Sequence, residues 1–248
     1  MMSAHAGTEI FRFRGEKMVV HYHRPAGPKR RRFPTVLFLH GFPGSEKGVD
    51  IQRALMAKGV ATVAPSFLGA WGSGGLYRFT TLPAQARAVL KAAGRLPFVD
   101  SRRLGVYGFS MGGWAALNMA AQEPRLKAVA VVAPVGGREM IGPGTLDFIT
   151  RLSRPLNTLP PRALAADFAK AVGAGDPARA ASRIKAPLLL VHGDADSTIP
   201  AAVSRRIAAH AAGPVRLSIE RGAEHDFLDR RARLTRLCAD FLARGVKG

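Results

Sequence analysis

Short apolar runs alternate with amphipathic helical patterns along most of this chain, and this alternation restricts its fold more than any other feature. The runs with the length and composition of buried strands are 36–39, 60–64, 104–107, 127–133, 188–191 and 215–219. Residues with helical spacing lie between them, at 49–58, 83–93, 111–122, 201–211 and 227–242. Strands that alternate with helices predict an α/β fold, in which helices cover both faces of a mostly parallel sheet.

The amino-terminal segment follows a different pattern. Apolar and polar residues alternate in 8–14 and again in 17–24, with Gly15 and Glu16 between the two stretches. This spacing predicts an antiparallel hairpin. The hairpin brings the expected sheet to about eight strands, a size that one α/β domain can hold.

A chain of 248 residues is long enough for one core but short for two, so we expect residues 1–248 to form a single domain. One stretch interrupts the alternation of strands and helices. Residues 137–186 are rich in Gly, Pro and Arg and join two of the predicted strands. A connection of this length exceeds an ordinary crossover, so we expect it to form a small cap with helices near 146–152 and 163–172.

The sequence contains neither a candidate membrane span nor a recognisable secretory leader. The longest useful apolar run, Ala128–Val135, has 8 residues, against the roughly 18 that a membrane helix needs. The amino terminus lacks a basic segment followed by an apolar one, and the single cysteine, Cys238, has no partner for a disulfide within the chain. We therefore expect no membrane span and a cytoplasmic location.

Basic residues dominate the charge of the chain. The 37 Lys and Arg residues outnumber 17 Asp and Glu residues, for a formal net charge of +20. Such a charge fits a nucleic-acid or membrane partner, an anionic substrate or a soluble arginine-rich surface. Apart from 29–32, the basic residues are scattered, without a basic helix face, zinc-finger spacing or aromatic RNA-binding strand. This distribution favours a soluble surface over a specific nucleic-acid partner and leaves an anionic substrate open.

Residues 108–112 read Gly-Phe-Ser-Met-Gly and fit the G-x-S-x-G pattern of a nucleophile elbow. A predicted strand precedes this segment and helix-forming residues follow it, as the elbow requires. Side chains at Gly108 and Gly112 would clash in such a tight turn. The pattern predicts Ser110 as a nucleophile. An ordinary helix cap at Ser110 would explain this motif, but not the companions described next.

A nucleophilic serine needs a base, and the base needs an acid that orients it. His225 follows the strand predicted at 215–219, and Asp194 and Asp196 follow the strand predicted at 188–191. The carboxyl ends of parallel strands meet at one edge of a sheet, so these loops converge on one crevice. The residues alone leave Asp194 and Asp196 as rivals for the role of the acid.

The segment His40-Gly41-Phe42-Pro43-Gly44-Ser45 follows the strand predicted at 36–39 and lies at the same edge. The backbone amide of Phe42 is a candidate donor to the oxyanion that forms during acyl transfer. The amide of Met111, next to the nucleophile, is the other candidate. We expect His40 to hold this loop by hydrogen bonds rather than to take part in the chemistry.

Taken in order, the motifs H-G-F-P-G-S, G-F-S-M-G-G, H-G-D-A-D-S-T-I-P and G-A-E-H-D-F resemble the α/β-hydrolase fold over nearly the whole chain. Together with Trp71-Gly72-Ser73-Gly74-Gly75, they are similar to small serine esterases of the dienelactone-hydrolase and prolyl-oligopeptidase group, including feruloyl-type esterases. The resemblance implies an α/β-hydrolase fold with Ser110 as nucleophile, His225 as base and Asp196 as acid.

The same resemblance implies that the backbone amides of Phe42 and Met111 form the oxyanion hole. It does not cover the cap, whose apolar residues are candidates for substrate binding. Phe148, Ile149 and Leu152 lie in the cap, and Trp71 lies in the glycine-rich motif. We expect these side chains to cover Ser110 and to determine acyl or leaving-group selectivity.

These features predict a serine carboxylic-ester hydrolase that forms an acyl-enzyme with a small-molecule ester. A peptidase or amidase with the same triad is the alternative, although the chain lacks the large amino-terminal gating domain of the peptidases that it resembles. A non-catalytic, basic nucleic-acid-binding protein is a more distant alternative. We expect no metal and no other cofactor, because the sequence has no paired metal-ligand spacing and no nucleotide-binding motif.

Overall fold

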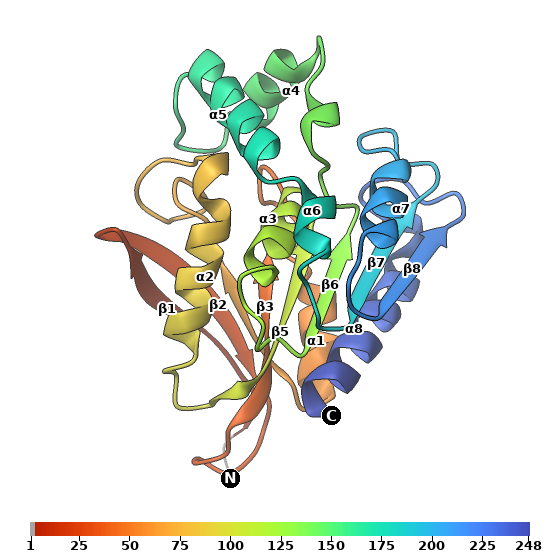
Figure 1. Ribbon diagram of the computed structural model, residues 1–248. Helices are drawn as coiled ribbons and strands as arrows, with labels where there is room; N and C mark the ends of the chain where they lie inside the picture. The colour runs from red at the N-terminus through yellow and green to blue at the C-terminus, as the bar shows by residue number, and fades with distance from the viewer. Residues whose placement is uncertain (1–2) are drawn as a thin grey trace.

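The computed structural model describes residues 3–248, which form an eight-stranded sheet (Figure 1). The strands are β1 (His5–Phe13), β2 (Glu16–Arg24), β3 (Phe33–Leu39), β4 (Ala61–Pro65), β5 (Val99–Phe109), β6 (Ala128–Val132), β7 (Leu188–Gly193) and β8 (Val215–Glu220). Their order in the sheet is β1-β2-β4-β3-β5-β6-β7-β8. The hairpin of β1 and β2 is antiparallel, as is the pairing of β2 with β4, and the other neighbours are parallel. This is the α/β-hydrolase fold that the motif order implies.

Helices follow most of the parallel strands. They are α1 (Val49–Ala57), α2 (Leu82–Ala93), α3 (Met111–Ala120), α4 (Thr145–Leu152), α5 (Pro161–Ala174), α6 (Pro177–Ala181), α7 (Ala202–Ala209) and α8 (Arg231–Lys247). Short 3-10 turns are η1 (Phe79–Thr81), η2 (Arg138–Met140) and η3 (Leu228–Arg230). None of the helices in residues 3–248 has both the length and the apolar composition that a membrane crossing requires.

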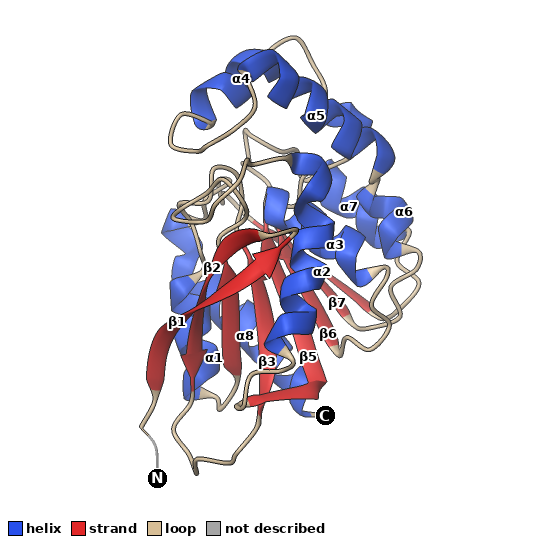
Figure 2. Ribbon diagram, turned by 90° about the vertical axis from the view of Figure 1, so that its left-hand side faces the viewer, coloured by secondary structure: helices blue, strands red, loops and turns tan. Residues whose placement is uncertain are grey.

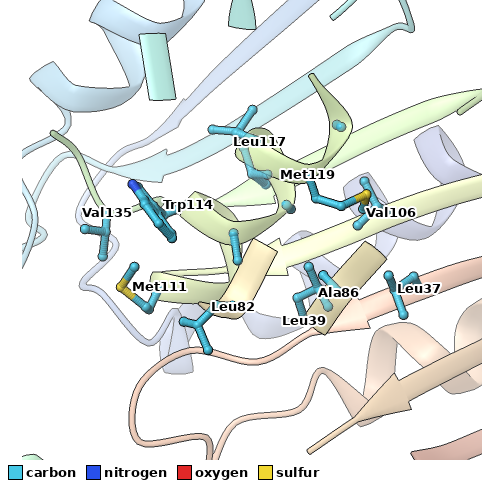
Figure 3. Packing of buried hydrophobic residues seen from close by; sticks show 14 of the residues in the cluster. Leu37, Leu39, Leu82, Ala86, Val106, Met111, Trp114, Leu117, Met119 and Val135 are labelled. Atoms are coloured by element: carbon cyan, nitrogen blue, oxygen red, sulfur yellow. The ribbon is translucent and has the colours of Figure 1, made fainter. Parts of the chain in front are cut away.

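The helices form a layer on each face of the sheet. Helices α1 and α8 cover one face, and α2, α3, α6 and α7 cover the other (Figures 1 and 2). Side chains alternate along a strand, so the apolar run of β3 serves both layers. Val36 and Phe38 pack with α1 and α8, whereas Leu37 and Leu39 pack with α2 and α3. Figure 3 shows Leu39 in this cluster together with Leu82 and Ala86 of α2.

Helices α4 and α5 lie beyond the carboxyl ends of the parallel strands, over the edge where the predicted site loops meet (Figure 1). The Thr80 hydroxyl donates to Asp167 Oδ1 of α5 at 2.6 Å, and the Tyr77 N–H donates to the Asn157 carbonyl at 2.8 Å. The fully buried Leu164 of α5 belongs to the main core. Helix α6 packs against α3 and α7 instead. The segment that overlies the sheet edge is therefore anchored through α5.

The carboxyl-terminal helix starts later than its sequence pattern predicts. The periodicity favours a helix over 227–242, but α8 begins at Arg231. Phe227 has a left-handed backbone, with φ 58°, and its ring is buried. The chain must turn at this residue before a helix can form. Cys238 lies on the inner face of α8, where burial raises the pKa of its thiol to about 12.

Candidate active site

Ser110 lies in the tight turn between β5 and α3. Its backbone has φ 54° and ψ −119°, a conformation that residues other than glycine rarely adopt. A Cβ atom at Gly108 would come within 2.3 Å of the Gly112 carbonyl oxygen, and one at Gly112 within 2.1 Å of the Leu39 carbonyl oxygen. Both contacts are shorter than any real carbon–oxygen packing distance. Glycine is therefore required on either side of Ser110, as the motif predicts.

A chain of hydrogen bonds joins Ser110 to the loops after β7 and β8. The Nε2 atom of His225 lies 3.1 Å from Ser110 Oγ, and its Nδ1 atom lies 2.7 Å from Asp196 Oδ2. A carboxylate oxygen only accepts, so Nδ1 carries the proton of the neutral ring. Nε2 is then free to accept the Ser110 hydroxyl proton. This arrangement can activate a serine as a nucleophile.

Asp196 is held by hydrogen bonds to both carboxylate oxygens. Oδ1 accepts from the backbone N–H groups of Thr198 at 2.9 Å and Ile199 at 2.8 Å. Oδ2 accepts from His225 and lies 3.2 Å from Nε2 of His192. Burial by itself would raise the pKa of Asp196, but these hydrogen bonds outweigh it and hold the pKa far below its usual value. The carboxylate is therefore ionised and fixed in orientation.

Asp194, the rival acid, lies in a different environment. Its side chain is exposed, and Oδ1 accepts the Gly222 N–H at 2.6 Å. This bond ties the loop after β7 to the loop after β8. The structure brings Asp196, and not Asp194, to His225, a choice that the sequence spacing left open.

Phe42 and Met111 line the same cavity as Ser110. Within residues 3–248, neither backbone amide donates to a protein acceptor. Met111 is the first residue of α3, where aligned peptide dipoles favour negative charge. Two unengaged N–H groups beside a serine can stabilise an oxyanion.

His40 holds the loop that carries Phe42. Its Nδ1 lies 2.7 Å from the Gly41 carbonyl, and its Nε2 accepts the Phe67 N–H at 3.1 Å. These partners place the proton on Nδ1. Burial lowers the pKa of His40 to about 4, so the ring is neutral near pH 7. His40 is a structural residue of the loop, as its sequence position suggested.

A cavity of about 610 Å³ opens beside Ser110 and His225. Helix α4 supplies Phe148, Ile149 and Leu152 to its wall, which are the cap residues expected there. The wall is mostly apolar, so it can accommodate an apolar group attached to a reacting carbonyl. No group of three or more His, Cys, Asp or Glu side chains in residues 3–248 is arranged to hold a metal ion.

Trp71 does not line this cavity, contrary to the expectation from the glycine-rich motif. Its indole N–H donates to the Pro43 carbonyl at 2.9 Å, and the side chain is 41% exposed. That hydrogen bond ties the ring to the loop that carries Phe42. Trp71 therefore contacts this loop and does not line the cavity.

Several cavity residues carry no sequence motif that could have identified them. Phe79 of η1 packs between Phe42 and Phe168, with ring centroids 4.9 Å and 5.2 Å away. Glu139 of η2 brings a carboxylate to the cavity wall. Met140 lies beside it. Each comes from a connection between regular elements, and only the fold brings these connections together.

The sequence pattern of the prolyl oligopeptidase family matches residues 54–248, which is most of the chain and includes Ser110, Asp196 and His225. This chain belongs to the prolyl oligopeptidase family. The match begins after the loop that carries Phe42, so this loop lies outside the matched residues.

Curated relatives of this family member include the uncharacterized protein Rv2307c of Mycobacterium tuberculosis strain H37Rv. It is 28% identical over 194 residues, which cover 78% of this chain and 63% of the relative. The uncharacterized protein MT2364 of strain CDC 1551 / Oshkosh matches to the same extent. This chain thus spans about 63% of the length of the curated relatives that it matches.

Solved structures with the same fold include a protein with bound ferulic acid and a peptidase. Est1E from Butyrivibrio proteoclasticus, described with bound ferulic acid, has a TM-score of 0.78 at 20% identity, over 97% of this chain and 100% of that chain. A puromycin-hydrolyzing peptidase of Mycobacterium tuberculosis has a TM-score of 0.77 at 21% identity, over 98% of this chain and 39% of that chain. At these identities the likeness establishes the fold.

Proposed function

We propose that this family member is a serine hydrolase of small carboxylic esters that works through an acyl-enzyme on Ser110. The observation that carries the proposal is the hydrogen-bonded chain from Asp196 through His225 to Ser110, next to two unengaged backbone amides. In this proposal Asp196 is the triad acid, His225 the base, and the amides of Phe42 and Met111 the oxyanion hole.

The proposed reaction follows from the proton on His225 Nδ1, which leaves Nε2 free to accept the Ser110 hydroxyl proton. His225 Nε2 takes the Ser110 hydroxyl proton as Oγ attacks the ester carbonyl, and the two amides bind the oxygen that becomes negative. His225 then gives the proton to the departing alcohol, which leaves an acyl group on Ser110. Water attacks this acyl-enzyme, and His225 takes a proton from the water and returns it to Ser110 Oγ as the carboxylic acid departs.

Two observations support an ester substrate over a peptide. The cavity beside Ser110 is mostly apolar and of a size suited to a small molecule. A solved structure with the same fold, Est1E, is described with bound ferulic acid, a small molecule. Membership of a family named for oligopeptidases keeps amide hydrolysis as the second candidate.

The test of the proposal compares Ser110→Ala with wild type on a neutral p-nitrophenyl ester. We expect kcat to fall by several orders of magnitude, because triad members act as a unit, while thermal unfolding stays cooperative. Ser182→Ala, at an exposed serine of the α6 carboxyl end, is the matched control and should keep wild-type kcat. Wild-type turnover in Ser110→Ala would overturn the proposal.

A matched ester and amide with the same acyl group separate the two candidate activities. We expect a much higher kcat/KM for the ester, because the cavity offers little polar surface to bind a peptide backbone. A kcat/KM for the amide equal to that for the ester would instead favour a peptidase or amidase.

A further inference from the structure

His192 is a buried histidine to which the proposed reaction gives no role. It lies near the end of β7, and its side chain is 0% exposed. One ring nitrogen, Nε2, lies 2.8 Å from the Ile199 carbonyl oxygen and 3.2 Å from Asp196 Oδ2. The other, Nδ1, lies 2.7 Å from Ser204 Oγ of α7. With both nitrogens engaged, the ring is held in one orientation beside the triad acid.

The partners of His192 determine which nitrogen carries its proton. Both partners of Nε2 are acceptors only, one a carbonyl and the other a carboxylate. Nε2 therefore carries a proton, which it shares between Ile199 and Asp196. In the neutral ring Nδ1 is an acceptor, and the Ser204 hydroxyl is the donor that it faces. A row of donors thus runs from Ser204 through His192 to Asp196.

This contact restrains the carboxylate oxygen that faces the base. Asp196 Oδ1 is fixed by two backbone N–H groups, whereas the partners of Oδ2 within residues 3–248 are the side chains of His192 and His225. In the proposed reaction, His225 must also accept and donate protons in turn, with Ser110, the leaving group and water as its partners. Without His192, Oδ2 would be held solely by the group that it has to orient. The N–H group of His192 is a second donor to Oδ2, and it keeps the carboxylate in place while His225 transfers protons.

We propose that His192 is a positioning residue of the triad: kept with its proton on Nε2 by Ser204, it fixes the Asp196 carboxylate toward His225. The inference rests on the proposed function, since it assigns His192 no bond-making step of its own. Its effect falls on the chemical step and therefore on kcat. A role confined to the cavity wall, through the carbonyl of Ile199, would raise KM instead.

The test compares variants that remove or restore the donor. His192→Leu removes the ring N–H at similar volume, whereas His192→Gln places an amide nitrogen near the position of Nε2. We expect His192→Leu to lower kcat about 10- to 100-fold, the equivalent of one hydrogen bond to a charged group, with KM within about threefold. We expect His192→Gln to recover most of the loss. Ser204→Ala should give a smaller loss of kcat.

His23→Leu is the matched control, because His23 is a partly buried histidine that contacts Gln52 and Thr62 away from the site. It should keep wild-type kcat. Each variant is also reacted with a fluorophosphonate, whose rate of addition reports the nucleophilicity of Ser110 without an ester substrate. Thermal unfolding shows whether each variant is folded.

The outcomes separate the two proposals. Unchanged kcat in a folded His192→Leu variant, a change in KM alone, or a His192→Gln variant no better than His192→Leu would overturn the positioning role. If the wild type turns over no ester but reacts with the fluorophosphonate, the ester function fails, and the labelling rates of the variants still decide the role of His192. A wild type that does neither would overturn both proposals.

Discussion

At the scale of single residues, the site depends on Ser110, whose strained backbone conformation is held by hydrogen bonds from neighbouring residues. The backbone of Ser110 lies in a region that costs about 1–3 kcal/mol for a residue with a side chain. Its N–H donates to the Val132 carbonyl, and its own carbonyl accepts from the N–H groups of Gly113, Trp114 and Val135. These bonds from α3 and β6 hold the conformation that lifts the hydroxyl toward His225.

The identity of the acid can be tested at the same scale. Asp196→Asn should lower kcat about 10³- to 10⁴-fold, because an amide cannot hold the His225 proton on Nδ1 or stabilise the charged ring. Asp194→Asn is the matched control two positions away, and it keeps an acceptor for the Gly222 N–H. We expect it to retain near-wild-type kcat. A larger loss in Asp194→Asn than in Asp196→Asn would contradict the assignment.

His40 makes a separate prediction about stability. Its pKa is 6.5 in an ordinary environment and about 4 in the fold. The unfolded chain therefore binds this proton at a higher pH than the folded chain, and stability falls as pH drops from 6.5 toward 4. We expect a loss of about 2 kcal/mol in the free energy of unfolding between pH 7 and pH 5 from this residue. Urea unfolding at both pH values measures it.

The same titration of a His40→Gln variant is the control for that prediction. The variant lacks the titrating group, so its loss of stability between pH 7 and pH 5 should be smaller by about the same 2 kcal/mol. Equal losses in the two proteins would show that His40 does not carry the effect.

At the scale of elements, α4 and α5 have different relations to the body of the protein. Helix α5 is part of the core, with Leu164 fully buried and Phe168 against Phe79. Helix α4 buries mainly Ile149, while Phe148 is 40% exposed although it borders the cavity. Removing the whole cap would therefore disrupt the core. Single substitutions in α4 and α5 can instead separate effects on ester selectivity from effects on stability.

Phe148→Ala should shift ester selectivity without unfolding the protein. Loss of a half-exposed ring enlarges the cavity at the cap, so we expect kcat/KM to rise for longer acyl chains relative to acetate. A series of p-nitrophenyl esters of increasing length measures the profile. An unchanged profile would remove α4 from the substrate site.

Leu164→Ala is the complementary variant in α5. It opens a space in the core, and we expect a loss of about 2–5 kcal/mol in the free energy of unfolding. Its effect on the ester-length profile should be small, because Leu164 is not among the residues that line the cavity. Denaturant unfolding gives the first quantity and the ester series the second. A shifted profile in Leu164→Ala would show that α4 and α5 act together on the substrate.

At the scale of the whole molecule, the net charge of +20 contrasts with the site. Among residues 3–248, the ionisable side chains that border the cavity are Glu139 and His225, with no lysine or arginine. Arg206 contacts Glu139 at 2.7 Å and also Asp176 at 2.9 Å, so this cluster has two carboxylates for one guanidinium. The cavity wall itself is therefore not basic.

The salt dependence of kcat/KM shows whether the net positive charge of the protein steers an anionic substrate, and a Glu139 variant tests the local charge at the cavity. We expect an ester with a free carboxylate to lose kcat/KM as salt rises, because the Debye length shrinks from about 10 Å at 0.1 M, while a neutral ester of similar size barely responds. Glu139→Gln should raise kcat/KM for the anionic ester roughly two- to fivefold and leave the neutral one unchanged. Parallel salt curves for the two esters would rule out steering by the net charge.

Much of the architecture was predictable because its signals are local. Short apolar runs and the spacing of apolar residues mark most of the strands and helices within a few residues. The glycines beside Ser110 reflect a clash within one turn, and the order of the loops follows from the rule that parallel strands end at one edge. The late start of α8 was not predictable, because the left-handed turn at Phe227 depends on where its ring is buried.

The sequence by itself determined the α/β-hydrolase fold, the elbow of Ser110 and the set of candidates for its partners. Only the tertiary structure decided that Asp196 reaches His225 while Asp194 binds Gly222, and that Trp71 lies outside the cavity. Only the structure showed that His192 contacts the Asp196 carboxylate and that Glu139 lines the cavity. The physical reason is range: periodicity and turn strain act between neighbours along the chain, whereas hydrogen bonds and cavities depend on distances between residues far apart in it.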